Sequence, residues 1–312
     1  MARFSSEQLH TFAAVLAEGT LEAAARQLNI TPSAVSQRLK ALEQASGRVL
    51  LQRSNPAQAT ESGQIVLRLA RQMAQLEADA ELELGLPGER PMVSVPIVVN
   101  ADSLAVWFLK ALTSVPAELN AVFDLHRDDE QHSTTMLRAG AVMAAVTATP
   151  EPVQGCRVEP LGSMRYRAVS TPGFRKRWLP DGISAATLNA APAVDFDRKD
   201  EYQHRFLELL GGTGTADQPP GPRHYVPSSQ EFAEAIRLGL GWGLIPEVQC
   251  RQDLERGRLV ELAPEKPLDI PLYWQRWRTP SRILDAVSDA VRATAGEMLR
   301  IQPKINTPRR QP

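Results

Sequence analysis

Cysteine and histidine are scarce in this sequence of 312 residues, which contains two cysteines and five histidines. Cys156 and Cys250 lie far apart, and neither belongs to a Cys-x-x-Cys pair. This spacing argues against a disulfide framework and against a zinc site, and it fits a reducing cytosol. The sequence also lacks a phosphate-binding loop, a Gly-x-Ser-x-Gly motif and metal-ligand spacing, so we expect neither catalysis nor a metal or other cofactor.

Long apolar runs and an excess of one charge are missing as well. The first twenty residues contain one basic residue and an interrupted apolar run, which predicts no signal peptide. No stretch approaches the length of a membrane span, so no membrane contact is expected. The formal net charge is -1, and any surface that binds nucleic acid must therefore be local. Together these features predict a soluble, cytoplasmic protein.

A helix-turn-helix pattern lies between Gly19 and Arg53. Thr20 is a good N-cap for a first helix, whose apolar positions fall on one face. Thr31 and Pro32 then begin a second helix as its cap and first residue. The apolar and polar positions of that helix lie on opposite sides, which is typical of a helix that enters the major groove of double-stranded DNA. The alternative is a pair of bundle helices whose charges form a solvated face.

The polar side of the second helix carries side chains that can contact DNA. Gln37 can form two hydrogen bonds with adenine, and Arg38 can bind guanine or a phosphate. Strands expected at 49–53 and 57–60 form a wing, with Arg53 at its base to contact the DNA backbone or the minor groove. The alternative is a surface hairpin without a DNA contact. The residues expected to bind DNA are Thr31, Ser33, Ser36, Gln37, Arg38, Lys40 and Arg53.

A long amphipathic helix is predicted over 61–85, with Thr60 as its cap. Apolar residues recur in steps of three and four and form a stripe that a lone helix cannot bury. We expect a second chain to cover this stripe, with packing against its own DNA-binding domain as the alternative. The stripe comprises Ile65, Leu69, Met73, Leu76, Ala80 and Leu84.

Beyond a Gly/Pro-rich hinge at 86–90, strands and helices alternate, which predicts an α/β domain with parallel strands. Strands are expected at 93–99, 121–125, 141–146, 164–170, 193–195, 243–245 and 272–276. Helices are expected at 103–112, 131–139, 202–210, 230–238 and 281–299. We therefore divide the chain into a DNA-binding domain (1–60), a linker helix (61–85), the hinge, an α/β domain (91–302) and a tail (303–312).

The sequences TPSAVSQRLKALE (31–43) and ATESG (59–63) resemble the winged helix-turn-helix of LysR-type transcriptional regulators. The resemblance implies an effector domain of two α/β lobes, like a periplasmic binding protein, with lobe one at 91–163 and 268–302 and lobe two at 164–267. It also implies a homodimer or tetramer on a dyad-symmetric operator, and contact with RNA polymerase. The stretches VNADSLAVWFLKAL, LGSMRYRAVSTPGF and GWGLIPEVQ resemble the ArgP/LysG branch, which senses basic amino acids such as lysine and arginine and activates genes for their exporters.

An effector of that class needs donors for its carboxylate and acids for its positive groups. Ligands of open α/β sheets bind at the carboxyl ends of the strands, against helix N-termini. The residues expected there are Asn100, Asp102, Ser103, Asp128, Asp129, Thr147, Asp197, Ser228, Ser229 and Trp274. Some of these have a purely structural alternative, as helix caps (Asp102, Ser103), solvated loop acids (Asp128, Asp129) or core packing (Trp274).

Three other functions compete with that of an effector-responsive activator. A low-specificity DNA-binding protein of the nucleoid or of a replication origin would lack a strong preference for one operator. A LysR-type regulator with a different small-molecule effector is the second alternative. A solute-binding protein for transport is the third, and the attached DNA-binding domain argues against it.

Overall fold

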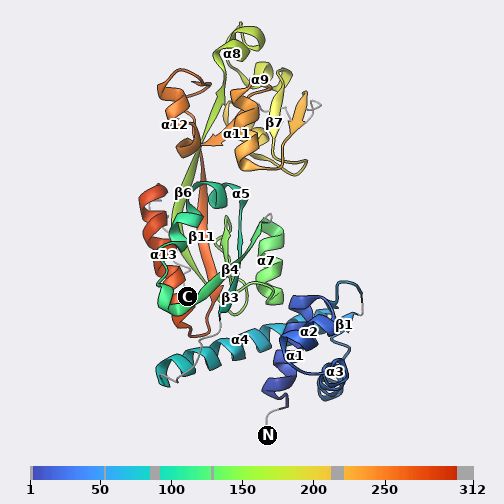
Figure 1. The fold of residues 1–312 in the computed structure, drawn as a ribbon. Helices are drawn as coiled ribbons and strands as arrows, with labels where there is room; N and C mark the ends of the chain where they lie inside the picture. Colours follow the sequence, from blue (N-terminus) through green and yellow to red (C-terminus); the bar gives the residue numbers. More distant parts are fainter. Residues whose placement is uncertain (1–2, 53, 85–91, 128–129, 212–220, 301–312) are drawn as a thin grey trace, which may run out of the picture.

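The computed structural model describes residues 3–52, 54–84, 92–127, 130–211 and 221–300. The molecule is elongated: a helical domain at one end is followed by a long helix, and two lobes are stacked beyond that helix (Figure 1). In the described part of the chain, no helix is long and apolar enough to cross a membrane. The expected hinge and tail lie outside the described residues, as do Arg53, Asp128 and Asp129.

Three helices form the N-terminal domain: α1 (Ser6–Glu18), α2 (Leu21–Gln27) and α3 (Pro32–Ser46). As predicted, the hydroxyls of Thr20 and Thr31 cap α2 and α3, because they accept the backbone N–H groups of Ala23 and Ala34 at 3.2 Å. The apolar sides of the helices meet in one core, which includes the buried residues Leu9, Phe12, Val35 and Leu42.

A two-stranded hairpin follows, as expected, and consists of β1 (Leu51–Gln52) and β2 (Gln58–Ala59). Glu43 of α3 positions its first strand, since Oε1 accepts the N–H groups of Leu50 at 2.8 Å and of Leu51 at 3.3 Å. Thr60 then caps the linker helix α4 (Glu61–Leu84) by accepting the N–H of Gly63 at 3.0 Å. The linker helix packs against α1 and continues along the end of lobe one (Figure 1).

The two lobes share one sheet. Lobe one contains three parallel strands, with β3 (Val93–Val99) between β4 (Ala121–Arg127) and β5 (Ala144–Thr147). Two long antiparallel strands, β6 (Cys156–Ser170) and β11 (Leu268–Trp277), continue this sheet and run from lobe one into lobe two (Figure 1). A change in the angle between the lobes must therefore bend β6 and β11.

In lobe two, β9 (Gly243–Pro246) and β10 (Val260–Glu261) pair with β6, while β7 (Ala193–Asp195) pairs in parallel with β8 (Arg223–Tyr225). The helices of this lobe are α8 (Pro172–Trp178), α9 (Ala185–Ala190), α10 (Tyr202–Leu209), α11 (Ser229–Arg237) and α12 (Glu247–Glu255).

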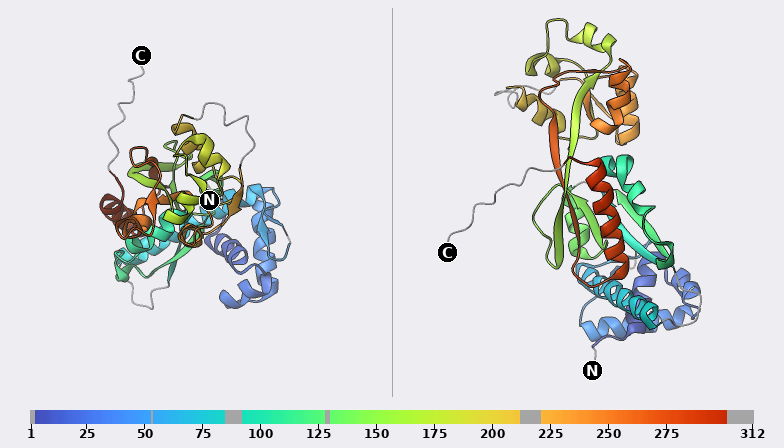
Figure 2. Two further views of the ribbon diagram at one scale, coloured as in Figure 1. Left: turned by 90° about the horizontal axis from the view of Figure 1, so that it is seen from above. Right: turned by 90° about the vertical axis from the view of Figure 1, so that its left-hand side faces the viewer.

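Helices also cover lobe one. After β3, α5 (Ala101–Ser103), a π-helical turn (Leu104–Phe108) and α6 (Leu109–Leu112) follow one another without a break. A 3-10 turn (Ala117–Leu119) leads into β4. The last helix, α13 (Arg282–Met298), packs beside α6, and α7 (Glu130–Ala139) lies across the sheet from α13 (Figures 1 and 2). The core of this lobe contains three fully buried tryptophans, Trp107, Trp274 and Trp277.

The expected elements of the α/β domain are present, but the two shared strands are longer than predicted. We expected a strand from Met164, whereas β6 begins at Cys156, and a return strand from Leu272, whereas β11 begins at Leu268. Pro160 and Gly162 interrupt the sequence pattern of β6, and the register of β11 shifts opposite them. The sequence analysis also missed β8, β10, α8, α9 and α12, which are short and bury few apolar side chains.

Candidate DNA interface and ligand site

The side of α3 that faces away from the domain core is polar. A helix with one buried side and one exposed polar side can enter the major groove, where amides read base edges and ammonium groups neutralise phosphates. Thr31 is also exposed, at the start of the helix, and its hydroxyl serves as the cap. The exposed residues of the polar side are Ser33, Ser36, Gln37 and Lys40.

Arg38, the other predicted DNA contact of this helix, is only partly exposed and lies at the edge of this set. Its guanidinium forms an ion pair with Glu7 of α1 at 3.2 Å and donates to Thr11 Oγ1 at 3.4 Å. The side chain is 31% exposed. Position 38 directly precedes the buried Leu39, so it lies at the border of the buried side and next to α1. Arg38 therefore joins two helices of the domain.

A second cluster of polar groups lies between the lobes, around Asp102 of α5. Tyr166 on β6 donates its hydroxyl to Asp102 Oδ2 at 2.6 Å, and Ser229 at the start of α11 donates to Oδ1 at 2.6 Å. In Figure 1, α5 of lobe one faces α11 of lobe two. The hydrogen bond from Ser229 to Asp102 thus connects the two lobes directly.

Asp102 is a carboxylate whose surroundings oppose its charge. Burial raises its pKa above the ordinary value, against the opposing effect of the hydrogen bonds from Ser229 and Tyr166. The pKa of the Tyr166 hydroxyl is raised well above its usual range by burial and by the negative charge of Asp102, so Tyr166 remains a donor. No lysine, arginine or histidine of the described ranges forms an ion pair with Asp102.

Further polar atoms near Asp102 are buried without a hydrogen-bond partner among the described residues. They are Asn100 Oδ1, Ser103 Oγ and Gln249 Oε1. The amide nitrogen of Gln249 donates to Ser229 Oγ at 3.1 Å, which extends the cluster into α12. Buried polar atoms of this kind normally have a partner, and unpaired ones are a feature of ligand sites.

Lobe two adds acidic groups at the carboxyl end of β7. Burial, together with the negative charges of Asp102 and Asp197, raises the pKa of Asp200, although its carboxylate accepts the N–H groups of Phe196 at 2.8 Å and of Tyr202 at 3.0 Å. Burial also raises the pKa of Asp195 to about 6, against the opposing charge of its ion-pair partner Arg223. The region between the lobes therefore concentrates acids in a desolvated setting.

Several predicted residues are occupied elsewhere. Thr147 Oγ1 accepts a hydrogen bond from Gln275 at 3.2 Å, and Ser228 donates to Glu231 one turn along α11. Asp197 accepts the N–H of Lys199 at 2.7 Å within its own turn. Trp274 is fully buried and donates to Ser288 at 2.9 Å, so its position fits the core-packing interpretation and not stacking on an effector.

The sequence analysis missed four residues of the cluster: Tyr166, Tyr202, Asp200 and Gln249. Tyr166 lies on the predicted strand, where Met164, Tyr166 and Ala168 alternate inward, and that alternation was the signal that could have found it. Its ring packs edge-on against Tyr202, with centroids 5.1 Å apart. Asp200 precedes α10, and Gln249 lies in the first turn of α12. Only the packing of these two helices in the folded protein brings both side chains to the cluster.

Two family models match the chain. Residues 6–64 match the bacterial regulatory helix-turn-helix protein of the lysR family, and residues 119–296 match the LysR substrate binding domain. The chain belongs to the LysR family. This membership agrees with the winged helix-turn-helix, the linker helix and the two α/β lobes described above, and it confirms the predicted fold class.

LysR-family relatives cover nearly the whole chain. The lysine export transcriptional regulatory protein LysG of Corynebacterium glutamicum is 43% identical over 295 residues, which are 94% of this chain and 98% of that protein. The crystal structure of ArgP from Mycobacterium tuberculosis has a TM-score of 0.82 at 41% identity, over 95% of this chain and 98% of that one. Full-length LysG from Corynebacterium glutamicum with bound effector Arg has a TM-score of 0.74 at 41% identity, over 95% of this chain and all of that one.

Proposed function

We propose that this LysR-family protein is a transcriptional regulator that responds to a basic amino acid such as lysine or arginine, and that it activates a gene for an amino-acid exporter. The observation that carries the proposal is Asp102, a desolvated carboxylate between the lobes that no described cation neutralises. A cationic ligand would supply the missing positive charge. The relatives support this assignment, because one of them is named for lysine export and a solved structure of it holds Arg.

The polar cluster offers both kinds of contact that a basic amino acid requires. Asp102 can bind an ammonium or guanidinium group, and the acids after β7 can bind a second cation. The carboxylate of the ligand needs donors, which Ser103, Ser229 and the amide of Gln249 can provide. Binding would replace the direct Asp102 to Ser229 bond by contacts through the ligand, and so change the angle between the lobes.

The regulator acts on DNA as a homodimer or tetramer in this proposal. Two copies of α3 would read the half-sites of a dyad-symmetric operator, and the activated form would contact RNA polymerase in the cytoplasm. Catalysis plays no part in this role. The wing would place Arg53 against the DNA backbone, and Thr31, Ser33, Ser36, Gln37 and Lys40 would face the groove.

Calorimetric titration of the full-length protein with lysine, arginine and leucine tests the effector. We expect saturable binding of the basic amino acids and none of leucine. Asp102→Asn should weaken that binding at least about a hundredfold, since the removed carboxylate leaves a buried cation unpaired. Asp181→Asn, at an exposed acid of lobe two, is the matched control and should bind as the wild type does. Equal binding of leucine, or no binding of any of the three, would refute the proposed effector.

A further inference from the structure

One side of the linker helix α4 faces lobe one. Arg68, Arg71, Gln75 and Asp79 recur in steps of three and four along this side, and Gln75 is only 3% exposed although it is polar. The contacts of Arg68, Arg71 and Asp79 with lobe one extend over twelve residues, or about 16 Å of helix. We call these three residues the linker clamp.

Arg71 binds the C-terminus of α7. Its Nη1 donates to the carbonyl of Gly140 at 2.7 Å and also to the carbonyl of Ala141. Carbonyl groups at the end of a helix lack partners within the helix and carry partial negative charge, so a guanidinium is a favourable partner for them. Arg71 thereby fastens α4 to the two residues that directly follow α7.

Arg68 occupies a space that two glycines leave open. Its guanidinium lies 5.9 Å from the ring centroid of Trp277, and Nη2 donates to the carbonyl of Gln154 at 3.3 Å. A Cβ on Gly140 would come within 2.8 Å of the Arg68 Cα, and a Cβ on Gly155 within 2.1 Å of its Nη2. Both glycines also have positive φ angles, which residues with a side chain rarely adopt. The close approach of Arg68 therefore requires glycine at both positions, for the missing Cβ and for the backbone conformation.

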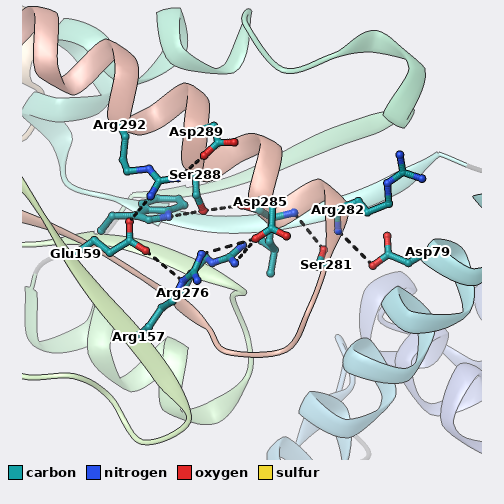
Figure 3. A network of polar contacts seen from close by, with 12 residues as sticks. Asp79, Arg157, Glu159, Arg276, Ser281, Arg282, Asp285, Ser288, Asp289 and Arg292 are labelled. Atoms are coloured by element: carbon teal, nitrogen blue, oxygen red, sulfur yellow. Dashed lines mark hydrogen bonds and ion pairs between the residues drawn. The ribbon is translucent and has the colours of Figure 1, made fainter. Parts of the chain in front are cut away.

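Asp79 binds the opposite kind of helix end. Its Oδ2 accepts the backbone N–H of Arg282, the first residue of α13, at 3.4 Å (Figure 3). From there the polar contacts continue through Asp285 to Arg276 and Arg157 at the ends of the shared strands. The linker helix thus holds α7 by its C-terminus and α13 by its N-terminus, each with the charge that suits that helix dipole.

The helix that Arg71 holds leads back to the region between the lobes. The strand before α7 ends at Arg127, whose guanidinium lies 5.8 Å from the ring centroid of Phe196 in lobe two. α7 then runs from residue 130 to residue 139, about 15 Å, and ends on α4 (Figure 1). The end of β4 thus contacts lobe two, and the end of the next helix, α7, contacts α4.

We propose that the linker clamp is the contact through which a change between the lobes reaches the DNA-binding domain, with α7 as the connecting helix and Arg71 as its main attachment. The inference rests on the proposed function for the identity of the effector. The contacts of the linker clamp are present in the structure whichever effector binds. Arg71 touches neither DNA nor effector in this scheme, so it acts as a positioning residue.

Hydrogen exchange on the full-length protein tests the clamp without any ligand. The amides of Gly140 and Ala141 are hydrogen-bonded within their own turn, to Leu137 and Met136. In Arg71→Ala, peptides covering 136–142 should exchange about tenfold faster, while peptides of α11 keep the wild-type rate. Arg71→Lys should recover part of the protection. Arg138→Ala removes the same charge from the exposed side of α7 and is the control. Unchanged exchange at 136–142 in Arg71→Ala would overturn the clamp.

Coupling is measured on a DNA fragment that the wild-type protein selects in vitro, with and without saturating arginine. Arg71→Ala should bind arginine within about twofold of the wild type, whereas the factor by which arginine changes its DNA affinity should fall towards one. Arg138→Ala should keep that factor. An unchanged factor in Arg71→Ala would refute transmission through α7. If wild-type protein fails to bind arginine, the proposed effector is wrong, and the exchange experiment still decides whether the clamp exists.

Discussion

At Asp102 the protein holds a carboxylate that burial pushes towards its neutral form. If Asp102 binds the effector as proposed, binding must depend on pH. Only the ionised carboxylate attracts a cation, so arginine affinity should decrease as the pH falls towards this raised pKa. The decrease begins at a pH where an aspartate of ordinary pKa is still ionised. Calorimetry from pH 8 to pH 5, in two buffers with different ionisation enthalpies, should also detect proton release on binding. In Asp102→Asn this proton release should disappear, and an unchanged proton release in that variant would contradict the assigned role of Asp102.

The sequence located Asp102 and Ser229 but not the residues that define their environment. Strand ends can be recognised from periodicity, and acids and serines there are natural candidates for ligand contacts. Tyr166 and Gln249, in contrast, reach the cluster only because β6 crosses between the lobes and α12 packs on β6. The burial that raises the pKa of Asp102 is a property of these neighbours, and no local sequence pattern encodes it.

At the scale of one helix, α3 separates the residues proposed to bind DNA from those that contact the rest of the domain. Lys40 is exposed on the polar side, whereas Arg38 pairs with Glu7. Lys40→Ala should lower the slope of log K against log salt by about 1, because one phosphate contact is lost. Arg38→Ala is the matched control: its DNA affinity and salt slope should stay at the wild-type values. Fluorescence anisotropy with the selected fragment at several salt concentrations measures both. A reduced slope in Arg38→Ala would show that Arg38 also contacts DNA.

The elements that could be predicted are those with a complete local signal. α3 has its cap, its proline and one apolar side, and each lies within fifteen residues of sequence. β6 has no such signal, because its inward face passes from the core of lobe one to that of lobe two across Pro160 and Gly162. α12 buries only Cys250 and Asp253, so its sequence lacks the apolar period of a helix.

For the whole molecule, α4 connects the DNA-binding domain to lobe one. Its first side packs on α1 through buried residues such as Val66, Leu67 and Ala70, and its second side carries the linker clamp. The third side is exposed and apolar: Ile65 is 71% exposed and Leu76 is 48% exposed. Exposed apolar residues of one stripe on a long helix favour pairing with a second helix. The single chain thus leaves open the side that a dimer would cover.

If α4 pairs with its copy through this third side, a charge placed there must separate the dimer. Ile65→Glu should yield a monomer by sedimentation and weaken operator binding at least about a hundredfold, because two linked half-site contacts become one. Ala74→Glu adds the same charge to α4 at an exposed position about half a turn from Ile65, and it should remain a dimer. Since α1 and the linker clamp use the other two sides, both variants should keep the fold of the single chain. A dimeric Ile65→Glu protein would show that another surface holds the two chains together.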